Sequence, residues 1–301
     1  MINGIINIRK EAGYTSHDVV AKLRGILKQR KIGHTGTLDP DATGVLPVCL
    51  GKATKLCNLI GDWEKTYEAV LLLGRTTDTE DTSGTVLSRS PVTVSEEEIR
   101  RILKSFEGDY EQIPPMYSAK KMQGRRLYEL AREGITVERE PCHVHISRVT
   151  IREIRLPEVS FSVTCSKGTY IRSLCRDAGE KAGCGGCMAS LVRSRVAGFD
   201  IENSLTLSEV EKALAEGRLD HYIIKIDSVF RDYPKLMVGE EGSRLLMNGN
   251  PVPISMTSAE AEDSLNPLTF RVYDRDEHFI GLYKNNPKKK RLEPLQLFFD
   301  I

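Results

Sequence analysis

The apolar positions in the first three quarters of the chain follow two periodicities. Stretches in which apolar residues alternate with polar ones, or run together over about four to eight residues, predict β-strands. Two such stretches, residues 144–154 and 159–165, are close in sequence and are expected to pair antiparallel. The other predicted strands are residues 2–8 and 66–73, and an apolar run over residues 45–50 predicts a further buried element.

Apolar residues that recur every three or four positions predict amphipathic helices between these strands. The first helix is expected to begin at Ser16, which can cap its N-terminus. The second begins at Ser95, where Glu98 completes a capping box. Ser208 with Glu211 predicts the start of a third. The pattern indicates a protein of mixed α and β structure.

The pattern changes after Tyr233, where short apolar stretches are separated by tight turns such as Asn248-Gly249. This change predicts a second, small β-rich domain. Before it, residues 113–134 are rich in proline, glycine and basic residues and end in a helical pattern, which predicts an insertion. We therefore expect a larger domain over residues 1–229, an insertion within it at about 110–140, and a small domain over residues 230–301.

Composition limits the class of protein. The chain has 301 residues, 40% of them apolar and 28% charged, as is typical of a globular protein of about two domains. Residues 1–10 lack the apolar core of a signal peptide and no apolar run could span a membrane, so we expect a cytoplasmic protein with no membrane contact. The net charge is only +1, but basic clusters, such as Lys120 to Arg126 or Arg193 with Arg195, are separate from acidic ones. Such segregation is compatible with one face that binds phosphates.

The cysteines and histidines predict neither a disulfide scaffold nor a metal site. The seven cysteines are odd in number and scattered. Cys184 and Cys187 have the spacing of zinc ligands, but no second pair matches them, and the glycines between them predict a turn after a helix. His143 and His145 alternate on a predicted strand, where we expect them at the surface.

The segment with the most chemistry lies at residues 33–44. Its three glycines and one proline predict a loop rather than a helix or a strand. It carries His34, Asp39, Asp41 and three threonines. The apolar run that follows is expected to hold this loop at the edge of a buried element, and loops held in this way often carry catalytic groups.

Parts of this loop are also compatible with other sites. A calcium loop that starts at Asp39 would need a glutamate at its twelfth position, which is Leu50. A phosphate-binding loop is excluded because Gly-Lys at residues 51–52 lacks the hydroxyl and the earlier glycine of that motif. Asp39 and Asp41 fit the D-x-D-x-T pair of phosphohydrolases, but residues 31–36 do not predict the apolar strand that should precede it. A purely structural turn is the remaining alternative.

The string from Gly33 to Gly44 closely resembles the catalytic loop of the TruB family, the bacterial synthases that make pseudouridine 55 in tRNA. In the family pattern GHTGxLDPxATG the aspartate is catalytic, and it corresponds to Asp39. Further segments resemble family motifs in the same order along the chain, and the last domain is similar to PUA modules. These segments are Lys65 to Ala69, Arg75 to Gly84 (with one extra threonine), Pro114 to Lys121, Ser166 to Arg172, and Leu191 to Phe199.

The resemblance implies an α+β catalytic domain around a mixed, mostly antiparallel sheet, followed by a small PUA-like domain. It also implies a monomer that flips uridine 55 out of the T loop of tRNA, cleaves its glycosidic bond and rejoins the base through C5, without a cofactor or metal. The resemblance implies that Asp39 is the catalytic carboxylate, Arg172 its charge partner and Tyr67 the base-stacking residue. It implies that Tyr170 forms a second wall of the base pocket, that His34 helps to hold the flipped base and that Leu191 also binds the substrate. The implied RNA contacts are Lys120, Lys121 and Arg125 in the insertion, and Lys288 to Arg291 for a more distant part of the tRNA.

The chemistry explains why these residue types belong together. A buried aspartate resists ionisation, and we expect the guanidinium of Arg172 to reverse that tendency and to orient the carboxylate. The sequence leaves open whether Asp39 attacks C1′, attacks C6 or removes a sugar proton, and which group takes the C5 proton. Two other functions stay open at this stage: a non-catalytic tRNA-binding or RNA-folding protein, and a metal-dependent phosphohydrolase that uses Asp39 and Asp41.

Overall fold

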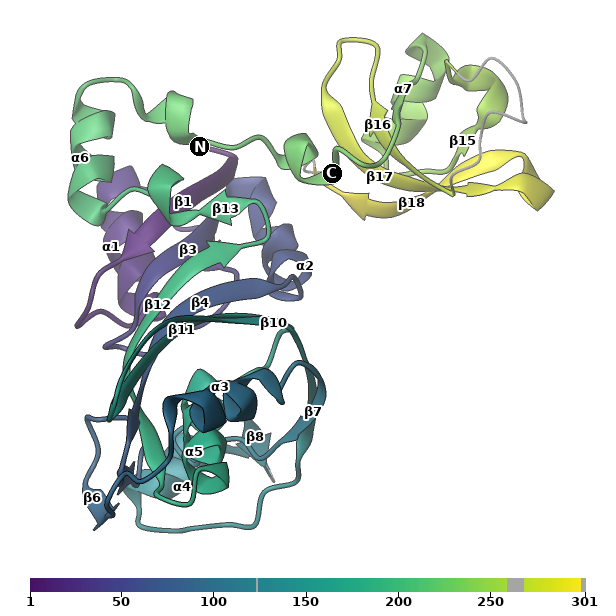
Figure 1. The fold of residues 1–301 in the computed structure, drawn as a ribbon. Helices are drawn as coiled ribbons and strands as arrows, with labels where there is room; N and C mark the ends of the chain where they lie inside the picture. The colour runs from purple at the N-terminus through teal and green to yellow at the C-terminus, as the bar shows by residue number, and fades with distance from the viewer. Residues whose placement is uncertain (123, 259–267, 299–301) are drawn as a thin grey trace.

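The computed structural model describes residues 1–122, 124–258 and 268–298, and it contains a large curved sheet and a smaller second sheet (Figure 1). The large sheet has nine strands, and β3 and β12 are its parallel neighbours, whereas its other pairs are antiparallel. The predicted mixed, mostly antiparallel sheet is therefore confirmed. Its strands lie in the order β1 (Gly4–Lys10), β3 (Thr43–Leu50), β12 (Gly186–Val196), β4 (Lys65–Leu73), β11 (Glu158–Cys165), β10 (Cys142–Arg155) and β7 (Gly108–Gln112), with β2 (Ile32–His34) beside β3 and β13 (Phe199–Asp200) beside β12.

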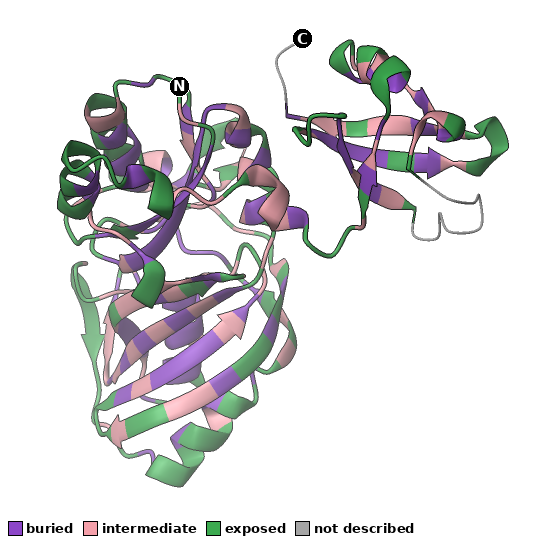
Figure 2. Ribbon diagram, turned by 90° about the horizontal axis from the view of Figure 1, so that it is seen from above, coloured by how far each residue is buried: buried purple, intermediate pink, exposed green. Residues whose placement is uncertain are grey.

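Two pairs of helices cover different parts of this sheet (Figure 1). The apolar stripe of the first pair packs on β1 and β3, and that of the second packs on β4, β10 and β11. Figure 2 shows that buried residues line the strands and the inner sides of the helices, while the outer sides are exposed. The first pair is α1 (Ser16–Leu27) and α6 (Leu207–Ala215), the second is α3 (Glu96–Lys104) and α5 (Ile171–Lys181), and a short α2 (Cys57–Gly61) follows β3.

Two segments that connect strands of the large sheet form small structures outside it. The first is a hairpin that follows β4. The second is the predicted insertion, which has a small apolar core formed by Met116, Leu127 and Leu130. Its final part is helical, as the sequence predicts. The hairpin is made of β5 (Arg75–Thr77) and β6 (Val86–Arg89), and the insertion contains β8 (Lys121–Met122), β9 (Arg125–Arg126) and α4 (Leu127–Arg132).

The C-terminal part forms a five-stranded sheet with a core of its own. Three aromatic side chains join this part to the apolar cluster that includes residues of β1 and β3: Phe230, Phe279 and Phe298. A hydrogen bond from Lys55 to the carbonyl oxygen of Leu297, at 2.8 Å, adds a polar contact. The sequence predicted the strands but not the helix. The elements are β14 (Lys235–Met237), α7 (Glu240–Met247), β15 (Val252–Pro253), β16 (Thr269–Tyr273), β17 (Phe279–Asn286) and β18 (Arg291–Leu297).

Some predicted boundaries are wrong for identifiable reasons. The N-cap of α1 is Thr15, whose side chain accepts from the backbone of Asp18, so Ser16 is not the cap. The cap of α6 is likewise Thr206 rather than Ser208. Ser95 does cap α3, as predicted. The predicted loop at 33–44 is shorter than expected, because its first two residues belong to β2 and its last two to β3.

Candidate active site

The loop that carries Asp39 lies where the two parallel strands of the large sheet meet. β3 begins at Thr43, which pairs with Val192 of β12, and Gly44 pairs with Arg193. Gly44 has a φ of +109°, and a Cβ there would lie 2.2 Å from the carbonyl oxygen of Arg193. Only glycine therefore allows β12 to approach so closely. This approach places the loop beside the central strands of the sheet.

The guanidinium of Arg172 holds the carboxylate of Asp39 with two of its nitrogens. Nε is 3.0 Å from Oδ2, and Nη2 donates to Oδ1 at 3.2 Å. Arg172 is the second residue of α5, and its side chain is 6% exposed, whereas 40% of the Asp39 side chain is accessible. This two-point contact fixes the plane of the carboxylate and leaves one edge open to a substrate.

Arg172 also contacts two other segments at the same point. Its Nη1 donates to the carbonyl oxygen of Thr79 at 3.0 Å and lies 3.8 Å from Oδ2 of Asp81. Its Nη2 donates to the carbonyl oxygen of Tyr117, in the insertion, at 2.9 Å. The guanidinium is therefore shared between the Asp39 loop, the segment after β5 and the insertion.

Burial and neighbouring charges act in opposite directions on the carboxyl group of Asp39. Burial has the largest effect and raises its pKa, the charge of Asp81 raises it further, and Arg172 and Lys10 lower it. The net direction is upward. The expectation that Arg172 reverses the effect of burial is therefore wrong, because burial has a larger effect on this carboxyl group than the charge of Arg172 does.

Lys10 is a buried cation that holds the same loop, and sequence analysis missed it. It is the last residue of β1 and has no exposed surface. Its Nζ donates to the carbonyl oxygens of Pro40 at 2.8 Å and of Tyr14 at 2.6 Å. Burial lowers the pKa of Lys10 to about 8, although the charges of Asp41 and Asp39 raise it. A lysine at the end of an apolar strand was the available signal.

Arg193 and Ser16 bind other parts of the loop backbone. Arg193 is 1% exposed, so its assignment to a surface cluster is wrong. Its Nε donates to the carbonyl oxygen of Val45 at 2.7 Å and its Nη2 to that of Gly36 at 3.3 Å. The hydroxyl of Ser16 accepts from the backbone N–H of Leu38 at 2.9 Å, which explains why it does not cap α1. The backbone is thus fixed on both sides of Asp39.

Tyr67 and Leu191 lie on one face of the sheet beside this loop. Tyr67 on β4 is opposite Arg193 on β12, and Leu191 is opposite Ala69, so all four share a face. Tyr67 is buried in the same apolar cluster as Leu38, next to Asp39, and Leu191 packs against that cluster. Burial raises the pKa of the Tyr67 hydroxyl, whereas Arg193 lowers it. The structure therefore brings both predicted base contacts to the catalytic loop.

His34 and Tyr170 lie at the ends of elements that lead into the site. His34 ends β2, and its ring meets that of His17 edge-on at a centroid distance of 5.1 Å. Burial lowers the pKa of His34, and its Nδ1 has no hydrogen-bond partner in the described part of the chain. Tyr170 directly precedes α5, and burial raises the pKa of its hydroxyl. His34 is therefore the last residue of the strand before the Asp39 loop, and Tyr170 is the last residue before the helix that carries Arg172.

The three basic residues expected to contact RNA differ in their surroundings. Lys120 is half-buried, and its Nζ lies 2.7 Å from Sγ of Cys142, at the start of β10. Arg125 is paired with Glu133 on the surface of the insertion. Lys121 is exposed on β8. The structure therefore leaves Lys121 and Arg125 accessible and turns Lys120 towards the base of the insertion.

The phosphohydrolase alternative finds little support in this geometry. A strand, β2, does precede the loop, contrary to expectation, but it ends at His34 and does not lead directly into Asp39. Asp41 is exposed and raises the pKa of Lys10, whereas Asp39 lies against Arg172. Among the described residues, a group whose geometry could hold a metal ion lies in the C-terminal part, and it consists of Asp274, Asp276 and His278.

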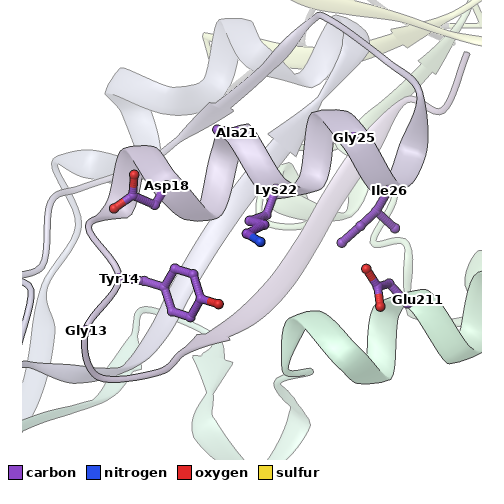
Figure 3. Close-up of a pocket in the computed structure, with 8 residues that line it drawn as sticks. All are labelled: Gly13, Tyr14, Asp18, Ala21, Lys22, Gly25, Ile26 and Glu211. Carbon is purple, nitrogen blue, oxygen red and sulfur yellow. The ribbon is translucent and has the colours of Figure 1, made fainter.

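A hollow of about 680 Å³ lies between α1 and α6 (Figure 3). It is open and lined by mixed polar and apolar side chains, among them Tyr14, Lys22, Ile26 and Glu211. None of the predicted site residues lines it.

Within residues 1–122, 124–258 and 268–298, no helix has the length and apolar character needed to cross a membrane.

Comparison with known families gives matches over most of the chain. Residues 24–171 match the model of the TruB family pseudouridylate synthase N-terminal domain. Residues 172–231 match the model of the tRNA pseudouridylate synthase B C-terminal domain. Together these models include the Asp39 loop, β4, the insertion and α5.

Individual relatives match over nearly their whole length. The chain is 49% identical to tRNA pseudouridine synthase B of Lachnoclostridium phytofermentans, covering 99% of this chain and 100% of that protein. It is 42% identical to the protein of that name from Pseudomonas fluorescens, covering 93% of this chain and 91% of that protein. Among solved structures, a chain in the crystal structure of a Cbf5-Nop10-Gar1 complex matches with a TM-score of 0.72 and 25% identity, covering 98% of this chain and 85% of that one.

Proposed function

We propose that this chain, which belongs to the TruB family of pseudouridylate synthases, converts uridine 55 in the T loop of tRNA to pseudouridine, with Asp39 as the catalytic carboxylate. The class of enzyme and its tRNA substrate follow from the family and from relatives named tRNA pseudouridine synthase B. The observation that carries the role of Asp39 is its two-point contact with Arg172, which orients the carboxylate and leaves one edge accessible.

The reaction needs an ionised carboxylate next to a uracil ring that can turn. The bond from C1′ to N1 breaks, the base rotates, and a bond from C1′ to C5 forms, while C5 loses a proton and N1 gains one. The open edge of Asp39 can act as nucleophile or as base in the first step. Arg172 and Lys10 favour the charged form, although burial has the larger effect and holds the pKa of Asp39 above its usual value.

The target base must leave the RNA stack to reach Asp39. Tyr67 and Leu191 lie on one face of the sheet beside the loop, where an unstacked uracil would find apolar contacts. We assign phosphate contacts to the insertion, through Lys121 and Arg125, and to Lys288 to Arg291 after β17. Residues 1–229 would then form the catalytic domain and residues 230–301 a PUA-like domain that binds the tRNA elsewhere. We infer a monomer that works in the cytoplasm, where its substrate is.

The proposal is tested by mapping pseudouridine in a tRNA transcript that has been treated with the purified protein. We expect one new pseudouridine, at position 55, and none in a transcript that carries cytidine there. The yield should be unchanged by EDTA while the tRNA stays folded. Activity that requires added metal, or release of inorganic phosphate from a phosphomonoester substrate, would favour the phosphohydrolase alternative. A protein that binds tRNA and modifies no uridine would favour the non-catalytic alternative.

A further inference from the structure

Gln112 lies at the junction between the large sheet and the insertion. It ends β7, and its side chain is 1% exposed. Its Nε2 donates to the carbonyl oxygen of Tyr170 at 3.0 Å, and its Oε1 accepts from the backbone N–H of Tyr170 at 2.8 Å. A primary amide that bonds both backbone groups of one residue fixes that residue's position and orientation, as a paired strand would.

The residue held in this way sits directly before the arginine of the active site. Tyr170 is the N-terminal flanking residue of α5, and Arg172 is the second residue of that helix. The side chain of Tyr170 does not cap this helix. Its carbonyl oxygen, to which Gln112 donates, also accepts the first hydrogen bond of the helix, from Leu174 N–H at 3.1 Å. A shift of Tyr170 would therefore move the guanidinium relative to Asp39.

The first residues of the insertion are tied to the same helix. The carbonyl oxygen of Ile113 accepts from Nη2 of Arg176 at 3.1 Å, and that of Tyr117 accepts from Nη2 of Arg172 at 2.9 Å. These two arginines are four positions apart, so they lie on one face of α5. Together with Gln112, they join the base of the insertion to the helix at three successive places.

We propose that Gln112 is a positioning residue for the reaction: its amide fixes the base of the insertion against the start of α5, and so keeps Arg172 in two-point contact with Asp39. This inference rests on the proposed function. It assigns to Gln112 no contact with the substrate. Gln112 thereby connects the insertion, to which we assign RNA binding, with Asp39, to which we assign the chemical step.

The consequence is a change in the chemical step and its pH dependence rather than in affinity. Asp39 is faced by Arg172 of α5, by Lys10 of β1 and by Asp81, and of these the guanidinium is the main group that lowers its pKa. If Arg172 moves away, burial and Asp81 act with less opposition and the pKa of Asp39 rises further. The acid limb of the rate profile should then move to higher pH.

The chain contains a matched control for this test. Gln29 is also buried and makes the same two-way contact, with its Oε1 accepting from Ile2 N–H at 2.8 Å and its Nε2 donating to the Ile2 carbonyl oxygen at 2.9 Å. It lies between α1 and β2, outside the site. Gln29→Met and Gln112→Met therefore both remove such a pair of hydrogen bonds and keep nearly the same volume, and Gln29→Met also removes a bond to the Lys31 carbonyl oxygen at 3.3 Å.

The experiment measures single-turnover rate against pH at saturating tRNA, together with the tRNA dissociation constant and the melting temperature. We expect Gln112→Met to slow the step by about ten-fold or more, as small misplacements of catalytic groups do, to raise the midpoint of the acid limb, and to leave the dissociation constant within about two-fold. Gln29→Met should lower the melting temperature similarly and leave rate and midpoint unchanged. Gln112→Glu, which keeps an acceptor for Tyr170 N–H but places a buried carboxyl against the Tyr170 carbonyl oxygen, should be slowed as well.

Results that would overturn the positioning role differ from results that would refute the proposed function. Gln112→Met with the rate and midpoint of wild type would overturn the positioning role, as would equal slowing by both methionine variants. If Gln112→Met does not fold, the same criteria apply to Gln112→Glu, and a wild-type rate and midpoint for that variant would overturn the role. A wild-type protein that forms no pseudouridine would instead refute the proposed function, and this inference with it.

Discussion

The catalytic loop at residues 35–42 and the insertion at residues 113–140 both belong to the proposed active site, but they are held in opposite ways. The loop has its backbone bonded by buried side chains from distant parts of the chain, Lys10, Ser16 and Arg193. The insertion has a small apolar core of its own and an exposed ion pair on its surface. Met116, Leu127 and Leu130 form the core, and Arg125 pairs with Glu133.

The difference matches what each region has to do. Buried hydrogen bonds from several elements fix a backbone tightly, which a catalytic carboxylate requires. A unit with its own core, attached at its base, can meet a folded RNA without disturbing the sheet. We therefore expect changes around the loop to affect chemistry and stability, and changes on the insertion to affect affinity for tRNA.

Removing the charge partner should have the largest effect among the residues that support the loop. We predict that Arg172→Met lowers the single-turnover rate by roughly 10²–10³-fold, as loss of one electrostatic contact at a reacting group does. It should also move the acid limb to higher pH, because burial and Asp81 then raise the pKa of Asp39 with less opposition. Rate profiles against pH measure both effects. Lys181→Met, on the exposed end of the same helix, serves as control, and an unmoved acid limb would contradict the pairing.

Removing a buried cation that holds the backbone around the loop, rather than the carboxylate of Asp39, should affect stability first. Arg193→Met leaves the carbonyl oxygens of Val45 and Gly36 without their donor, which we expect to cost about 2–4 kcal/mol. The melting temperature should fall by several degrees and the rate should fall with it. Arg195, two positions along β12, is exposed and paired with Asp200, so Arg195→Met is the control. Equal melting temperatures for the two variants would contradict a supporting role for Arg193.

Changing one exposed charge on the insertion should have the smallest effect. We predict that Lys121→Gln raises the dissociation constant for tRNA by a few-fold and reduces the slope of log affinity against log salt by about one, as loss of a single phosphate contact does. The rate at saturating tRNA should stay that of wild type. Lys212→Gln, on the exposed side of α6, should leave affinity unchanged. A slower chemical step in Lys121→Gln would remove the distinction between the two regions.

Periodicity was sufficient to predict the strands β4, β10 and β11 and the helices α1 and α3, because each buries one regular face. Helix starts were less certain, because neighbouring hydroxyls compete for the cap: Thr15 caps α1 while Ser16 binds the loop. The short helix α7 was missed, since its apolar Leu245 and Leu246 are adjacent rather than spaced along a face.

The candidate site was predictable only in part. Asp39, Arg172 and Tyr67 stand in strings long enough to be recognised by resemblance. The roles of Lys10 and Arg193 depend on contacts with backbone carbonyl oxygens far away in the chain, 30 positions for Lys10 with Pro40 and 148 for Arg193 with Val45. Such acceptors have no residue signature, because every residue carries one. The upward direction of the Asp39 pKa likewise depends on burial by distant segments, which outweighs the charge of Arg172.

The most direct test of the proposed catalytic role compares Asp39→Asn with Asp41→Asn, two substitutions of the same kind in one loop. Asparagine keeps the size of the side chain and lacks the anionic oxygen that can act as nucleophile or base. Single-turnover rates and tRNA dissociation constants should be measured on folded variants. We predict that Asp39→Asn binds tRNA within a few-fold of wild type and forms no detectable pseudouridine, while Asp41→Asn retains most of its activity. A wild-type rate for Asp39→Asn, or equal losses in both variants, would contradict the assignment.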